Sequence, residues 1–175
     1  MDLALKNLKD FKEVADKLGI RFMLQEGTLL GAYRDKGFVK DDENDIDLGI
    51  MDDQFHRVEE LIERLEEKGF LFHKGFYVNG KFQGGALVKG DSHIDIMRML
   101  LDGDEIINYG EAGKIKYIYP KEIFNGYSKI DFYGVEYDAP KDIEGFLSTR
   151  YGDWKTPVGK EEYSYKDPKY SPNVR

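Results

Sequence analysis

The first part of the chain alternates between helical and extended spacing of its apolar residues. From Leu3 to Leu18 apolar residues recur at helical spacing, which predicts an amphipathic helix that ends at Gly19. A strand from Arg21 to Gln25 and a short helix from Thr28 to about Lys36 are expected next. The polar run from Lys40 to Asn44 predicts a loop. This part of the chain is therefore expected to alternate helix and strand.

The middle of the chain is richer in extended patterns. The segment from Asp45 to Met51 predicts a buried central strand, and Asp52-Asp53 predict the capped start of a helix that runs to about Lys68. Asn79-Gly80 predicts a hairpin turn and Asp102-Gly103 a second turn. Further strands are expected at residues 71–78, 83–88 and 93–100, and weaker ones at 105–108, 116–119 and 129–133.

The last part of the chain predicts one helix and then an irregular segment. The helix runs from Asp142 to Arg150, after Pro140. From Trp154 onward the chain is rich in Pro, Lys and Tyr and shows no periodicity, which predicts an arm that packs back or frays. We therefore predict one α+β domain over residues 1–153, with a mixed β-sheet flanked by helices, and a C-terminal arm over residues 154–175.

Composition narrows the class of protein. At 175 residues, with 41% hydrophobic residues, the chain is long and apolar enough for one folded domain. It has no cysteine, which excludes disulfides, thiolate metal sites and a cysteine nucleophile, and suits the cytoplasm. A net charge of −8 without a basic stripe argues against nucleic acid as a partner. A charged amphipathic start and the lack of a long apolar run predict neither a signal peptide nor a membrane span.

Two carboxylates carry the clearest chemical pattern. Asp45 and Asp47 stand at positions i and i+2 of the predicted central strand, so their side chains project from the same face. Two such groups repel each other unless a cation lies between them, and hard oxygen ligands suit Mg²⁺ or Mn²⁺. A solvent-facing edge strand is the alternative, but the flanking Ile46 and Leu48 favour a core strand. We therefore predict a divalent cation at this pair.

Two other segments can complete such a site. Asp95 lies between isoleucines in an alternating run, so a strand beside the Asp45–Asp47 strand would make it a third metal ligand or a general base. Its alternative role is an ion pair with Arg98 or a lysine. Upstream, Gly27-Thr28 precedes a predicted helix, where backbone N–H groups can bind phosphate, although Thr28 can also act as an ordinary N-cap.

The roles of the nearby charged residues stay open at this point. Arg34 fits either a cation for donor phosphates or an ion-pair partner of Asp35 or Glu26. The acidic run at residues 41–43 fits either a solvated loop or one further ligand. His93 is two positions before Asp95 and is a candidate acid or base, though a structural role suits it better.

A glycine-threonine segment, an Asp-x-Asp strand and a later single aspartate together resemble the nucleotidyltransferase fold. The resemblance is closer to the LicD/fukutin family, whose core reads GTLLGA-x-R-x-x-GF-I before a run of aspartates ending in Asp-Ile-Asp. Here residues 27–39 read GTLLGAYRDKGFV and residues 45–47 read DID. Residues 151–157, YGDWKTP, are similar to the family's closing YG-x-W-x-x-P segment. Where the family usually has Pro-Trp before its aspartates, this chain has Lys40–Asn44.

The resemblance implies a metal-dependent enzyme that transfers a phospho-alcohol, phosphocholine or an alditol phosphate, from a CDP-linked donor to a glycan hydroxyl. In that interpretation Asp45, Asp47 and Asp95 hold Mg²⁺ or Mn²⁺ and carry catalysis, while Gly27, Thr28 and Arg34 bind the donor. One alternative is a nucleotidyltransferase that moves a nucleoside monophosphate from a triphosphate to a hydroxyl. Another is a non-catalytic nucleotide-binding domain, which the cost of an unused buried acidic cluster disfavours.

Overall fold

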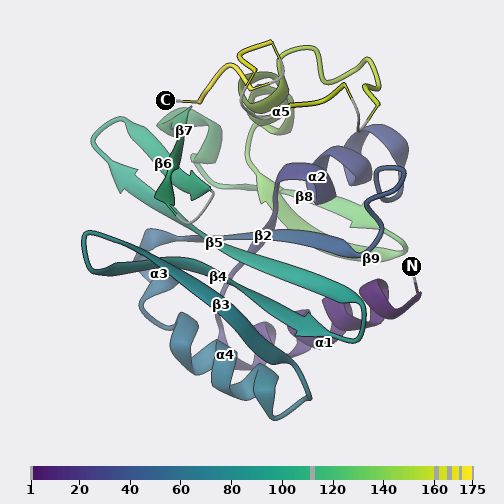
Figure 1. Ribbon diagram of the computed structural model, residues 1–175, viewed down its shortest axis with the longest axis vertical. Helices are drawn as coiled ribbons and strands as arrows, with labels where there is room; N and C mark the ends of the chain where they lie inside the picture. Colours follow the sequence, from purple (N-terminus) through teal and green to yellow (C-terminus); the bar gives the residue numbers. More distant parts are fainter. Residues whose placement is uncertain (1, 111–112, 160–161, 165–166, 170, 175) are drawn as a thin grey trace.

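The protein is built on a mixed sheet with helices on both faces, as seen in the computed structural model (Figure 1). The structure describes residues 2–110, 113–159, 162–164, 167–169 and 171–174. Five strands follow the order β1-β2-β5-β4-β3, and β6 and β7 extend the sheet from the end of β5. Their bounds are β1 Met23–Leu24, β2 Asp45–Met51, β3 Leu71–Val78, β4 Lys81–Lys89, β5 Ser92–Asp102, β6 Glu105–Gly110 and β7 Ile115–Pro120. The predicted α+β class with a mixed sheet is confirmed.

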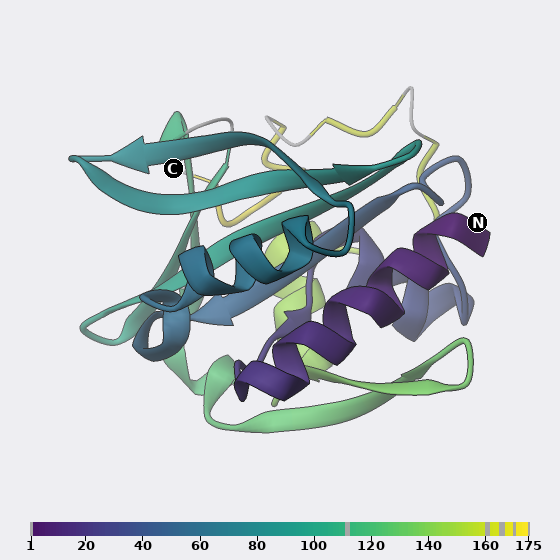
Figure 2. The ribbon, with the colours of Figure 1, turned by 90° about the horizontal axis from the view of Figure 1, so that it is seen from below.

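One face of the sheet is covered by two helices, α1 (Asp2–Leu18) and α4 (Val58–Glu66), which cross it in Figure 2. The alternate residues Ile46, Leu48 and Ile50 of β2 point to this side and are completely buried. Burying these side chains holds β2 at the centre of the molecule. The carboxylates of the same strand must consequently lie on the opposite face.

That opposite face carries α2 (Glu26–Leu30), a π-helical turn at Gly31–Asp35 and α5 (Ile143–Tyr151) (Figure 1). The predicted helix from Thr28 to Lys36 is therefore wrong in its start and its form. The helix begins two residues earlier and changes to π-helical hydrogen bonding at Gly31. Gly31 allows this change because a Cβ there would lie 2.4 Å from the carbonyl oxygen of Gly37.

Two other predicted elements are shorter than expected. Only Met23 and Leu24 of the first predicted strand pair with β2, because the N–H of Arg21 donates to the side chain of Gln54 instead. The single helix expected from Asp52 to Lys68 is broken into α3 (Asp52–Phe55) and α4. Arg57 lies at the break and donates to the carbonyl of Leu18, closing the C-terminus of α1. Neither Asp52 nor Asp53 caps the helix through its side chain.

A separate hairpin, β8 (Tyr127–Phe132) and β9 (Val135–Pro140), forms a second sheet that contacts β1. The sequence predicted its first strand at residues 129–133, which starts two residues late and ends one residue late. Tyr133 belongs to the turn, with φ +53°. The second strand was not predicted. A 3₁₀ turn, η3 (Lys121–Phe124), links β7 to this hairpin. Beyond α5 the described residues form an irregular segment, which pairs with β7 through a bridge between Tyr117 and Val174.

Candidate active site

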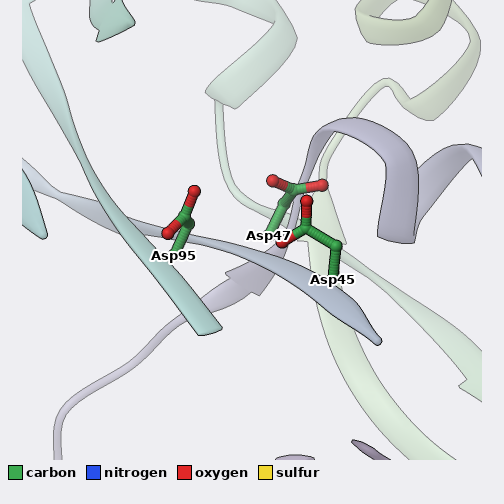
Figure 3. Close-up of side chains that lie close together, drawn as sticks. All are labelled: Asp45, Asp47 and Asp95. Atoms are coloured by element: carbon green, nitrogen blue, oxygen red, sulfur yellow. The ribbon is translucent and has the colours of Figure 1, made fainter. Parts of the chain in front are cut away.

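Three carboxyl groups meet on the face of the sheet that carries α2. Strands β2 and β5 run parallel, with Asp47 opposite Asp95. Because alternate residues of a strand share a face, Asp45 and Asp47 project together beside Asp95, as Figure 3 shows. One carboxylate oxygen from each of the three lies within 4.8 Å of the others. The expectation that Asp95 lies on a strand beside the Asp45–Asp47 strand is confirmed.

Burial and the neighbouring negative charges raise the pKa values of Asp47 and Asp95. Burial raises the pKa of Asp47 well above its ordinary value, and the charges of Asp45 and Glu26 raise it further. Burial and the charge of Asp45 raise the pKa of Asp95 to about 6. A divalent cation between the oxygens would remove this repulsion, and three carboxylates are hard ligands of the kind that Mg²⁺ and Mn²⁺ prefer. The donor set therefore fits such a cation. Arg98 is not the partner of Asp95, because its guanidinium binds Asp52 on the other face.

The start of α2 is bonded directly to the carboxylate strand. The backbone N–H of Gly27 donates to Asp47 Oδ2 at 3.0 Å. The hydroxyl of Thr28 accepts from the N–H of Asp47 at 2.9 Å, and Thr28 is almost fully buried. The alternative role of Thr28 as an ordinary N-cap is excluded, because the N-cap residue is Gln25, which makes no side-chain cap. Gly27 and Thr28 thus fix Asp47 in place.

Arg34 is held by protein groups in the structure. Its guanidinium makes two parallel hydrogen bonds to Asp35, at 2.7 and 2.8 Å, so this pairing is confirmed. A third bond reaches the carbonyl of Trp154 at 3.1 Å. Arg34 also lines the cavity described below.

A buried ion pair joins α2 to α5, and the sequence did not predict it. Glu26, paired with Arg150, also accepts a hydrogen bond from the hydroxyl of Tyr119 at 3.0 Å. Arg150 donates to the hydroxyl of Ser171 at 2.6 Å and lies against the ring of Tyr117, 4.3 Å from its centre. Arg34, closer in sequence, was one expected partner of Glu26, but the fold brings Arg150 to it instead. The one indication in the sequence that Arg150 lies near the site was its position directly before the Tyr151-Gly152 motif.

A cavity of about 420 Å³ opens beside Asp47. The N-terminal half contributes Gly27, Arg34 and Lys40 to its wall. The opposite wall comes from α5 and the segment that follows it. Residues of that wall include Arg150, Tyr151, Asp153, Trp154, Thr156, Val158 and Tyr163. The cavity therefore lies between the carboxylate strand and the C-terminal part of the chain.

Comparison with known proteins assigns the family. The model of the LicD/FKTN/FKRP nucleotidyltransferase domain matches residues 19–142, most of the chain. The chain belongs to the LicD/FKTN/FKRP family. The matched range contains Gly27, Thr28 and the three carboxylates, so the resemblance noted from the sequence is confirmed.

Among the relatives of this LicD/FKTN/FKRP chain is the ribitol-5-phosphate transferase FKTN of Mus musculus. The two are 28% identical over 179 residues, which cover 99% of this chain and 36% of that protein. The Homo sapiens protein of the same name is 26% identical over 178 residues, covering 96% of this chain and 37% of the relative. An uncharacterised protein of Rickettsia typhi is 26% identical over 150 residues, or 84% of this chain and 45% of its own. The chain thus spans less than half the length of these relatives.

Solved structures confirm the nucleotidyltransferase-like fold. The crystal structure of ANT(2'')-Ia in complex with adenylyl-2''-tobramycin has a TM-score of 0.52 at 14% identity, covering 81% of this chain and 70% of that one. A solution structure of ANT(2'')-Ia gives a TM-score of 0.54 at 16% identity, covering 80% and 66%. None of the helices in the described part of the chain is both long and apolar enough to cross a membrane.

Proposed function

We propose that this LicD/FKTN/FKRP chain transfers a phospho-alcohol, phosphocholine or an alditol phosphate, from a CDP-linked donor to a hydroxyl of a glycan. The observation that carries the proposal is the meeting of Asp45, Asp47 and Asp95, with Asp47 lining a cavity large enough for much of a nucleotide. Family membership and the names of the FKTN relatives support this reaction class.

The proposed donor lies in the cavity with its diphosphate towards Asp47. Arg34 lines the cavity and is the proposed contact of the donor phosphates. Gly27 lines it too, but its N–H is engaged by Asp47 Oδ2, so we assign Gly27 to holding this carboxylate. Thr28 is engaged with the backbone of Asp47, so we assign it to holding the strand. The rings of Tyr151, Trp154 and Tyr163 in the C-terminal wall offer apolar surface to the nucleoside.

In the proposed reaction the acceptor hydroxyl attacks the phosphorus that carries the alcohol, the bond from this phosphorus to the CMP oxygen breaks, and CMP leaves. Asp45, Asp47 and Asp95 would hold Mg²⁺ or Mn²⁺, which supplies charge neutralisation on the diphosphate. Asp95 would also take the proton of the attacking hydroxyl. A carboxylate oxygen of Asp95 that does not contact the cation would accept this proton.

Nucleotidyl transfer from a nucleoside triphosphate is the second candidate. It is favoured by the fold shared with ANT(2'')-Ia, whose structure contains an adenylylated product. The products separate the two reactions, because phospho-alcohol transfer releases CMP and nucleotidyl transfer releases pyrophosphate.

The test is a thermal-shift series with Mg²⁺ or Mn²⁺ and CMP, CDP-choline, CDP-alditols or the four nucleoside triphosphates. We expect metal-dependent stabilisation by a cytidine diphosphate compound and none in Asp47→Asn, which keeps the size of the side chain but removes its charge. Asp102→Asn, at the exposed far end of β5, is the matched control and should respond like the unchanged protein.

Stabilisation by a triphosphate alone would support nucleotidyl transfer. An Asp47→Asn protein that still turns over a CDP-linked donor would contradict the assignment of the carboxylates. No response to any nucleotide would leave the protein as a non-catalytic member of the family.

A further inference from the structure

The buried Glu26–Arg150 pair lies next to the three aspartates of the site but does not belong to that group. Glu26 is 7% exposed and Arg150 is 5% exposed. Taking both charges out of water is costly, and an apolar pair of similar volume is often as stable. Stability alone therefore gives a weak reason for this pair, and its position suggests a second role.

The backbone at Glu26 is in a conformation that needs support. Its φ is +43°, in the left-handed region that L-residues rarely adopt. The same residue begins α2, and the next N–H along the chain, that of Gly27, donates to Asp47. The conformation of Glu26 thus sets the direction of the N–H that holds Asp47.

The side chain of Glu26 is fixed by two residues that are distant in sequence, on β7 and α5. Both of its oxygens are engaged, one by the hydroxyl of Tyr119 and the other by Arg150. Arg150 is in turn held by Ser171 and by the rings of Tyr117 and Tyr151, 4.3 and 4.8 Å from its guanidinium carbon. A continuous set of contacts therefore runs from the C-terminal segment through Arg150 and Glu26 to Gly27.

We propose that Glu26 and Arg150 are positioning residues, which hold the Gly27 N–H on Asp47 and so couple the C-terminal segment to the carboxylate group. Without the pair, Glu26 relaxes from its left-handed conformation and Gly27 releases Asp47. The carboxylate then loses its fixed direction, and the cation that we propose in the previous section binds more weakly.

The experiment compares two double variants in which each ion pair becomes neutral. In Glu26→Gln/Arg150→Met neither buried charge is left alone. In the matched control, Asp52→Asn/Arg98→Met, the removed ion pair joins α3 to β5 on the other face of the sheet. Hydrogen exchange of the Gly27 amide is measured by NMR in the metal-free proteins, with the Leu48 amide of β2 as internal reference. Mn²⁺ affinity is measured by calorimetry.

We expect the Gly27 amide of the Glu26–Arg150 variant to exchange roughly tenfold faster relative to Leu48, as for the loss of a hydrogen bond to a charged group. Its Mn²⁺ dissociation constant should rise by roughly the same factor, with no change in the control variant. Unchanged protection of Gly27 and unchanged Mn²⁺ affinity, with only a lower melting temperature, would overturn the inference. If the unchanged protein does not bind Mn²⁺, the proposed function fails, and the exchange of Gly27 still decides whether the pair positions it.

Discussion

The hydroxyl of Thr28 forms its hydrogen bond with the backbone of β2 and not with the backbone of its own helix. The oxygen accepts from the N–H of Asp47 at 2.9 Å and lies 3.5 Å from the carbonyl of Asp45. A threonine before a helical segment usually predicts an N-cap, so the sequence placed Thr28 at the right site with the wrong partner. Which backbone group a hydroxyl meets depends on the tertiary contact between α2 and β2, which a local pattern does not contain.

Thr28→Val tests this contact at constant shape. Valine keeps the volume but leaves the N–H of Asp47 buried without a partner, so we expect the free energy of unfolding to fall by about 1–3 kcal/mol. Thermal or urea unfolding of the metal-free protein measures the change. Thr28→Ser keeps the hydroxyl and should lose clearly less. Equal losses in the two variants would mean that the methyl group matters and the hydrogen bond does not.

At the scale of elements, the sequence predicted what depends on periodicity and missed what depends on distant partners. The strands at residues 45–51 and 71–78 were predicted with the bounds that the structure has. Apolar residues recur at alternate positions of β2, and β3 ends at Asn79-Gly80. The break between α3 and α4 was missed, since it follows from Arg57 reaching the end of α1. The proximity of Asp95 to Asp47 was predicted from the similar apolar patterns around the two residues. The cavity wall was not predicted, because it requires α5 to pack near the carboxylate strand, and the spacing of residues in the sequence does not indicate this contact.

The β8–β9 hairpin offers a test of how this second sheet is attached. Asp138 of β9 binds Arg21 at 2.5 Å and Lys129 at 2.9 Å. Burial alone would raise the pKa of Asp138, but the hydrogen bonds from Arg21 and Lys129 outweigh burial and hold the pKa below its ordinary value. A lowered pKa means that the folded state favours the ionised form of this carboxyl group.

The stability contributed by Asp138 is therefore present above its unfolded pKa and is lost as the pH falls through its folded pKa. We expect Asp138→Asn to lower the free energy of unfolding at pH 7 by about 0.5–1 kcal/mol, a small value because Arg21 is largely exposed. In urea titrations the difference from the unchanged protein should shrink as the pH falls below about 3.9, the ordinary pKa of an aspartate. Asp104→Asn, at an exposed position in the turn between β5 and β6, is the control. A difference that persists at low pH would exclude the ion pairs as its cause.

At the scale of the whole molecule, the C-terminal segment is part of the site. Trp154 is 8% exposed, its ring N–H donates to Ser148, and its carbonyl accepts from Arg34. Farther on, the carbonyl of Asn173 accepts from the N–H of Ile118 in β7. These contacts hold the C-terminal segment against Arg34, α5 and β7. The division of the chain after residue 153 stays a prediction.

Removal of residues 154–175 tests that division. We expect the free energy of unfolding to fall by roughly 3–5 kcal/mol from the loss of the buried tryptophan alone, together with the loss of CMP binding. Urea unfolding and calorimetry measure the two effects. Trp154→Phe is the milder comparison and should retain most of both. A shortened chain with full stability and full CMP affinity would show that the segment is a separate appendage.

The three carboxylates have one more consequence, for reading other members of the family. In the metal-free protein they repel one another, so a chain that had given up the chemistry would gain stability by exchanging any of them for an amide or an apolar side chain. In an inactive member of the family, substitutions at these three positions would therefore accumulate. A related sequence that still carries all three carboxylates has kept their cost in folding stability. Their presence is therefore a criterion for separating active from inactive members of the family.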